Sequence, residues 1–133
     1  MTGEPTLAKR VEAQFALPEE ALGGEARAVF DAFLAGLERG EIRAAETGPE
    51  GWRVNDWVKK GILLGFRIGR VTEFPPAGPL RFFDKDTLPP RRLTLAEGVR
   101  LVPGGSAVRS GAYLGPGVVV MPPAYVNVGA WVG

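Results

Sequence analysis

The 133-residue sequence contains no cysteine and no histidine. Without cysteine the chain cannot form disulfides, thiolate metal sites or a thiol nucleophile. Without histidine it lacks the side chain that serves most often as a metal ligand and as a general base near neutral pH. We therefore expect no metal site and no nucleophilic site of the Ser-His-Asp type.

The sequence also lacks a strong net charge and any long apolar run. Sixteen basic and fifteen acidic residues give a net charge of +1, which does not favour binding to nucleic acid or to a membrane surface. No apolar run approaches the ~20 residues that span a bilayer, and the first residues do not resemble a secretory signal. We expect a cytoplasmic protein with neither nucleic acid nor a membrane as partner.

Two helices are predicted in the first 40 residues. Apolar residues from Leu7 to Leu17 predict a short amphipathic helix that ends before Pro18. A longer apolar stripe predicts a helix over 24–39, with Gly40 as its stop signal. The stripe consists of Val29, Phe30, Phe33, Leu34 and Leu37.

A third helix is predicted to begin at Asp56, after a turn at 47–51, with Asn55 as its N-cap. Gly61 and Gly65 lower its helix propensity but permit close packing of a neighbouring element. Its predicted buried face consists of Trp57, Ile62, Leu63 and Phe66, and Lys59 and Lys60 are predicted to lie on the solvent side.

The composition changes in the second half, where most of the 19 glycines and 12 prolines lie. The segment 69–92 is rich in proline and predicts a connector of loop and short strand. Arg91 and Arg92 at its end are interpreted as solvent-exposed linker residues.

A six-residue repeat begins at Val102. Every sixth residue from there is aliphatic, and the residue four places after each is small or β-branched. This pattern predicts a parallel β-helix in which three hexads complete one triangular turn and both columns face inward. The aliphatic column is Val102, Val108, Leu114, Val120, Val126 and Val132, the small column is Ser106, Ala112, Val118, Ala124 and Ala130, and the predicted corner glycines are Gly105, Gly111, Gly117 and Gly129.

These patterns predict an α+β chain, with an N-terminal helical α/β domain and Pro-rich connector over 1–97 and the start of a β-helix over 98–133. The last hexad stops after two residues, and a solenoid normally needs at least about three repeats to bury its core. We therefore expect the chain to be the truncated first part of a longer protein.

Three segments resemble the tetrahydrodipicolinate N-succinyltransferase family, and the resemblance runs from about Ala26 to the C-terminus. They are VNDWVKKGILLGFRI, FFDK and EGVRLVPGGSAVRSGAYLGPGVVVMPPAYVNVGAWV. Gly61 stands where the family usually has alanine. The resemblance implies an N-terminal helical domain, a left-handed parallel β-helix and a homotrimer with active sites between neighbouring β-helices.

The resemblance also implies an activity. Family members transfer a succinyl group from succinyl-CoA to the amino group of ring-opened tetrahydrodipicolinate, in lysine and diaminopimelate biosynthesis. Succinyl-CoA is then a co-substrate, and no tightly bound cofactor is expected. The family's catalytic carboxylate lies in a coil that would follow the last residue of this sequence, so we expect no catalytic residue within the chain and no activity from the chain alone. The residues that bind CoA are not assigned.

One site residue is carried over from the family. Arg100, in GVRLVP, aligns with the family's arginine that binds the dicarboxylate substrate. A guanidinium suits this role because its planar donors match a carboxylate and it stays charged at any relevant pH. Arg100 lies six residues before Ser106, in the inward column, so it must face a ligand or a partner, or precede the first true coil. The alternative is a structural arginine that pairs with Glu97.

Other readings stay open. A related acetyl-transferring enzyme and a non-catalytic trimerising module are alternatives to succinyl transfer. Tyr113, Tyr125 and Trp131 are predicted to pack outside the coils or at a contact between subunits. The remaining polar candidates are interpreted as structural rather than catalytic: Ser106, Ser110, Glu19, Glu20, Asp84 and Asp86.

Overall fold

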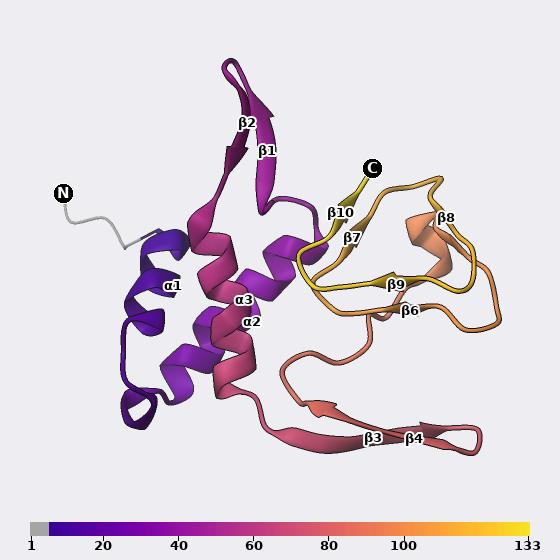
Figure 1. Cartoon of the computed structure of the whole chain (residues 1–133), viewed down its shortest axis with the longest axis horizontal. Coiled ribbons are helices and arrows are strands. Elements are labelled where there is room, and N and C mark those ends of the chain that lie inside the picture. Colours follow the sequence, from indigo (N-terminus) through magenta and orange to yellow (C-terminus); the bar gives the residue numbers. More distant parts are fainter. Residues whose placement is uncertain (1–5) are drawn as a thin grey trace.

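The computed structural model describes residues 6–133 and shows a bundle of helices beside a short coil of strands, with two projecting hairpins (Figure 1). The helices are α1 (Leu7–Phe15), α2 (Gly24–Glu38) and α3 (Asp56–Ile68), and the 3₁₀ turns are η1 (Glu19–Ala21) and η2 (Leu95–Glu97). The hairpin strands are β1 (Ala45–Gly48), β2 (Gly51–Val54), β3 (Val71–Ala77) and β4 (Leu80–Lys85). The coil strands are β5 (Arg100–Leu101), β6 (Ala107–Val108), β7 (Tyr113–Leu114), β8 (Val119–Val120), β9 (Tyr125–Val126) and β10 (Trp131–Val132).

The three helices pack around one apolar core, and all three were predicted. The helix predicted over 24–39 is confirmed and ends one residue earlier, followed by Gly40 with a φ of 75°. Thr6 precedes α1, and its hydroxyl accepts the Lys9 N–H at 3.3 Å. The buried core residues come from all three helices, the connector and the coil: Val11, Val29, Phe30, Phe33, Leu37, Val58, Leu88 and Val128.

The predicted buried face of α3 is confirmed for Trp57, Ile62 and Phe66, which pack against the core, and wrong for Leu63. Leu63 is 40% exposed, whereas Val58, Gly61, Leu64 and Gly65 are buried. The reason is that the Phe30 and Phe33 rings of α2 lie directly over the two glycines, where no side chain stands in the way. The close packing that Gly61 and Gly65 were predicted to permit is therefore confirmed.

Asn55 stands at the N-cap position of α3, but its side chain does not cap the helix. Its amide group donates instead to the Arg43 carbonyl at 2.8 Å and to Oε1 of Glu46 at 3.0 Å. Asn55 therefore ties the start of α3 to the strand β1 rather than to its own first turn.

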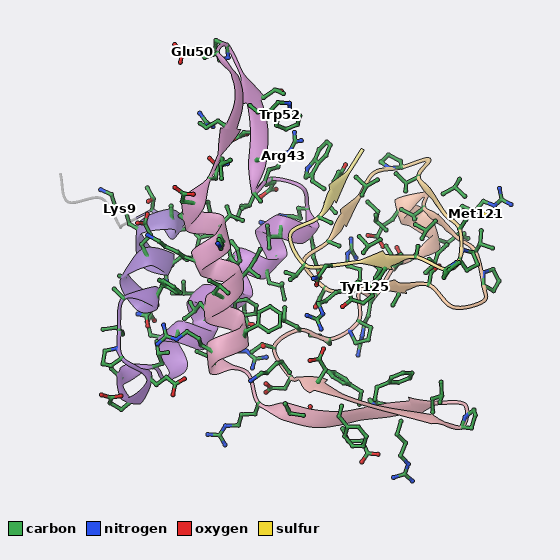
Figure 2. All side chains as sticks on the ribbon, in the orientation of Figure 1. Lys9, Arg43, Glu50, Trp52, Met121 and Tyr125 are labelled. Atoms are coloured by element: carbon green, nitrogen blue, oxygen red, sulfur yellow. The ribbon has the colours of Figure 1, made fainter. Side chains whose placement is uncertain are left out.

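Two antiparallel hairpins project from the body of the molecule (Figure 1). The β1–β2 hairpin turns at Pro49 and Glu50, within the predicted turn, and its Trp52 is exposed (Figure 2). The segment 69–92 is more regular than predicted because it contains the β3–β4 hairpin. Pro75 is tolerated there since a two-stranded hairpin has free edges, and the register shifts between Phe74 and Ala77.

The coil strands pair in parallel, as the six-residue repeat predicts. Ala107 pairs with Tyr125, and Tyr113 pairs with Trp131, so paired residues lie 18 positions apart. Three hexads therefore separate each strand from its partner in the next turn of the coil. The four predicted corner glycines all have positive φ angles, between 84° and 111°.

Most of the two predicted columns face the interior of the coil. The buried members are Val108, Ala112, Leu114 and Val120, and Val118, Ala124, Val126 and Ala130 pack against them. Val132 is 38% exposed, in the last strand of the chain.

The first hexad departs from the predicted register by one residue. Arg100 pairs with Val119 and Leu101 with Val120, which is an offset of 19 rather than 18. Leu101, not Val102, is therefore the partner of the inward-facing Val120. The path from Leu101 to Val108 is seven residues long, whereas the path from Val120 to Val126 is six, so the first corner holds one additional residue.

Aromatic side chains join the coil to the helices. The Tyr113 and Trp131 rings lie 4.9 Å apart, and the Arg43 guanidinium lies 3.8 Å from the centre of the Trp131 ring. Nε1 of Trp131 donates to the Gly40 carbonyl at 3.1 Å. The predicted outside position of these two rings is confirmed, and the helical part of the same chain covers this face of the coil.

The substitution Gly61→Ala is expected to destabilise the fold. A Cβ at this position would lie 2.6 Å from Cζ of Phe33, and overpacking of this kind costs about 1–3 kcal/mol. Urea unfolding of the variant should show this loss in the free energy of unfolding. The substitution Gly24→Ala, at a position with open space, should be neutral or stabilising.

A compensating substitution separates overpacking from other causes. In a Phe33→Leu background the ring is gone, so Gly61→Ala should cost much less than in the parent chain. An equal cost in both backgrounds would show that the Phe33 ring is not responsible.

Candidate functional site

Arg100, the predicted substrate-binding residue, lies on β5 with its side chain exposed. Its backbone N–H donates to the Val118 carbonyl at 2.9 Å, which holds the residue at the edge of the coil. Because it pairs with the outward-facing Val119, it lies outside the coil and not in the inward column that a strict six-residue period would give it. Among residues 6–133 the structure describes no ion pair to Arg100, which leaves its guanidinium free for an anionic ligand.

Glu97 does not pair with Arg100 but with Arg91, at 2.7 Å. The Arg91 side chain is only 9% exposed, so the interpretation of Arg91 as a solvated linker residue is wrong. It also donates through Nε to the Ala112 carbonyl at 3.2 Å. Arg91 thus links the connector, the turn η2 and the second hexad of the coil.

The Glu97 carboxylate closes the short loop that leads to β5. Its Oε2 accepts the Thr94 N–H at 2.6 Å and the Thr94 hydroxyl at 3.2 Å. These backbone and side-chain donors, together with the Arg91 guanidinium, hold the pKa of the Glu97 carboxyl below its usual range, although burial opposes the shift. We call Arg91, Thr94 and Glu97 the latch.

The latch borders a cavity of about 500 Å³ between α2 and the coil. Glu38 and Arg39 line it from the helix side, and Tyr113 and Pro116 line it from the coil side. Glu38 is already engaged, because it accepts the Gly111 N–H at 3.0 Å. Glu38 therefore attaches the coil to α2, whereas Arg39 pairs with Glu41 at 3.0 Å.

A second cavity of about 500 Å³ lies between the β3–β4 hairpin and the β6–β9 face of the coil. Tyr125, which is 60% exposed, lies on this face (Figure 2). Phe74 and Phe82 of the hairpin line the cavity from the other side. Arg109 pairs with Asp84 across its wall, so both charges are neutralised.

The other polar candidates have structural partners. Asp86 accepts the Arg70 N–H at 2.8 Å and pairs with Arg27 at 3.4 Å. The Arg70 backbone N–H is the main reason why the pKa of the Asp86 carboxyl is lowered, which does not suit a general acid at neutral pH. Ser110 donates to the Pro89 carbonyl at 2.6 Å, whereas the buried hydroxyl of Ser106 has no partner among residues 6–133.

The lysine pair of α3 is divided between two environments. Lys59 is exposed, and Lys60 pairs with Glu12 of α1 at 3.5 Å. Among residues 6–133 no cluster of three or more acidic side chains could hold a metal ion. The same residues include no helix whose length and apolar character would let it span a bilayer.

Comparison with known proteins places this geometry in a family. The family model described as "Tetrahydrodipicolinate N-succinyltransferase N-terminal" matches residues 6–68, which cover all three helices and the β1–β2 hairpin. Proteins named 2,3,4,5-tetrahydropyridine-2,6-dicarboxylate N-succinyltransferase match beyond this region, into the coil that carries Arg100. The chain belongs to the tetrahydrodipicolinate N-succinyltransferase family.

Three relatives show how far the similarity extends. The protein from Polynucleobacter asymbioticus is 39% identical over 88% of this chain and 44% of its own length. The protein from Idiomarina loihiensis is 44% identical over 73% of this chain and 36% of its own length. The protein from Xylella fastidiosa is 38% identical over 98% of this chain and 49% of its own length. The chain thus spans less than half the length of these relatives of the N-succinyltransferase family.

Sequence reasoning missed the latch, although a signal was present. Thr94 and Glu97 have the S/T-x-x-E spacing of a capping box, in which the acidic side chain returns to the N-cap backbone. That signal marks the start of a helical turn at η2. It does not indicate that Arg91 takes part, because the ion pair between Arg91 and Glu97 depends on how the connector folds against the coil.

Protonation of Glu97 should weaken the fold. A carboxyl group with a lowered pKa in the folded state contributes stability above its unfolded pKa of about 4.3 and loses it as the pH falls through the folded pKa. Glu97→Gln should therefore cost about 1–3 kcal/mol near neutral pH and much less in acid. Urea unfolding of the parent chain and of Glu97→Gln, from neutral to acidic pH, measures the difference in their free energies of unfolding.

Glu50→Gln is the matched control, because Glu50 lies at the tip of the β1–β2 hairpin (Figure 2). Its effect on the free energy of unfolding should be small at every pH. A Glu97→Gln penalty that stayed constant into acid would show that the carboxylate charge is not what stabilises the latch.

Proposed function

We propose that this chain forms the N-terminal part of an enzyme that transfers a succinyl group from succinyl-CoA to the amino group of ring-opened tetrahydropyridine-2,6-dicarboxylate. The reaction would serve lysine and diaminopimelate biosynthesis in the cytoplasm. Succinyl-CoA acts as a co-substrate rather than a tightly bound cofactor. The names of the relatives support this proposal, since each describes N-succinyl transfer to this dicarboxylate.

Within this chain, Arg100 binds a carboxylate of the dicarboxylate substrate. The observation that carries this role is its outward position on β5, without a carboxylate partner among residues 6–133. Arg91 and Arg109, which serve the fold, each pair with a carboxylate, and Arg100 differs from them in this respect. The catalytic carboxylate belongs to a later coil, so the chain alone is inactive.

The parallel strands represent the first coils of a left-handed β-helix, which begins at about residue 98 after the helical domain over 1–97. Three observations support this proposal: the 18-residue pairing, the inward columns and the corner glycines. Within residues 6–133, strands β8, β9 and β10 pair on one edge only. Further coils would complete these edges, and three copies of the complete protein would form a homotrimer.

Arg100→Ala in the full-length enzyme should weaken binding of the dicarboxylate far more than binding of CoA. Loss of a charged hydrogen-bonding partner costs about 2–3 kcal/mol, which corresponds to a KM for the dicarboxylate raised about 30- to 150-fold. Steady-state kinetics with each substrate varied in turn measures both effects.

Arg92→Ala is the control, because Arg92 is an exposed arginine in the preceding loop. It should leave both KM values nearly unchanged. Equal effects of Arg100→Ala on the dicarboxylate and on CoA would contradict a role in dicarboxylate binding, and a preference for acetyl-CoA over succinyl-CoA would favour an acetyltransferase.

A further inference from the structure

The direction in which Arg100 points depends on the one-residue shift in strand pairing. An 18-residue offset, as between β6 and β9, would place Arg100 opposite Val118, which packs inside the coil. The observed offset places it opposite Val119, which is 49% exposed. Because successive residues of a strand point to opposite sides, a shift of one residue exchanges inside for outside.

The first feature that holds this shift is the corner between β5 and β6. Its additional residue is accommodated at Gly104 and Gly105, whose φ angles are 116° and 111°. These angles lie in the region that favours glycine, so the corner can bulge without a side-chain penalty. Without this bulge the additional residue would pass into β5, and Arg100 would then lie opposite Val118 at the 18-residue offset of the other strands.

The second feature is the latch on the other side of β5. Glu97 is fixed by Arg91 and Thr94, and Gly98 follows it with a φ of 71°. The Gly98 carbonyl accepts the Gly117 N–H at 2.9 Å, which aligns the start of β5 with the next turn of the coil. The latch therefore holds the chain in place three residues before Arg100.

We infer that Glu97 and the Gly104–Gly105 corner are positioning elements that fix the register of β5 and thereby turn Arg100 outward toward the dicarboxylate. Neither contacts the ligand. This inference rests on the proposed function only for the identity of the ligand. The register itself is a property of this chain and can be measured without any substrate.

Cysteine labelling measures the register directly, because the chain has no cysteine of its own. Arg100→Cys should react rapidly with the thiol reagent DTNB, whereas Val99→Cys, which faces the coil interior, should react at least about tenfold more slowly. The opposite order in the otherwise unchanged chain would overturn the inference.

The double substitution Gly104→Val and Gly105→Val tests the corner, because β-branched residues rarely adopt the φ angles that the bulge requires. In this background the order should reverse, with position 100 protected and position 99 reactive. Arg100→Cys also removes the guanidinium, so the shifted register does not bury a charge. An unchanged order in the folded double variant would show that the corner does not set the register.

Glu97→Gln tests the latch. It should reduce the difference in labelling rate between positions 99 and 100, and leave the slow labelling of Leu114→Cys in β7 unchanged. Glu97→Asp, which keeps the charge, should restore part of the difference. Equal acceleration at positions 99, 100 and 114 would indicate general loosening and would contradict a positioning role.

Calorimetric titration with pimelate, an unbranched dicarboxylate with the carbon count of the proposed substrate, separates the two proposals. Binding should be lost in Arg100→Ala and weakened about tenfold in Glu97→Gln, equivalent to about 1.4 kcal/mol. If the parent chain bound no pimelate while the labelling pattern held, the carboxylate-binding role would fail and the positioning inference would stand.

Discussion

The parallel pairing between successive turns of the coil is the interaction on which the rest of this structure depends. It places residues 18 positions apart side by side, so a short run of hexads buries two inward columns and offers three outward faces. One face is covered by the helices through Tyr113 and Trp131. A second lies beside the β3–β4 hairpin, and the third carries Arg100. The position of each functional group follows from the face to which the pairing assigns it.

The regular parts of the fold could be predicted from the sequence because they repeat locally. The apolar stripe of α2 and the hexads after residue 102 each contain several equivalent positions, so one misplaced residue does not hide the pattern. The face of α3 could be predicted in part: Trp57, Ile62 and Phe66 pack against the core, whereas Leu63 is exposed because Phe30 and Phe33 approach the helix at its two glycines. The strands β3 and β4 were obscured by prolines, which a free strand edge accommodates.

The candidate site was predictable in identity but not in geometry. Arg100 could be named from GVRLVP, yet a strict period of six assigns it to the coil interior. The additional residue at Gly104–Gly105 interrupts that period. No local sequence signal shows whether Arg100 keeps the register of the later hexads. Arg91 was wrongly predicted to be solvent-exposed for a related reason. Its burial depends on contact with Ala112, 21 positions later in the chain, whose carbonyl accepts from Nε of Arg91. Both errors arise where long-range pairing outweighs local pattern.

The Phe30 and Phe33 rings have a mechanical consequence for the molecule. The Phe30 ring fills the space beside Gly65, and the Phe33 ring fills the space beside Gly61. The side chains of α2 therefore interlock with the surface of α3. Sliding one helix along the other would lift both rings over a helical ridge and open voids in a close-packed core. Because Trp131 of β10 donates to the Gly40 carbonyl just after α2, the coil is anchored next to the helix whose position both rings fix.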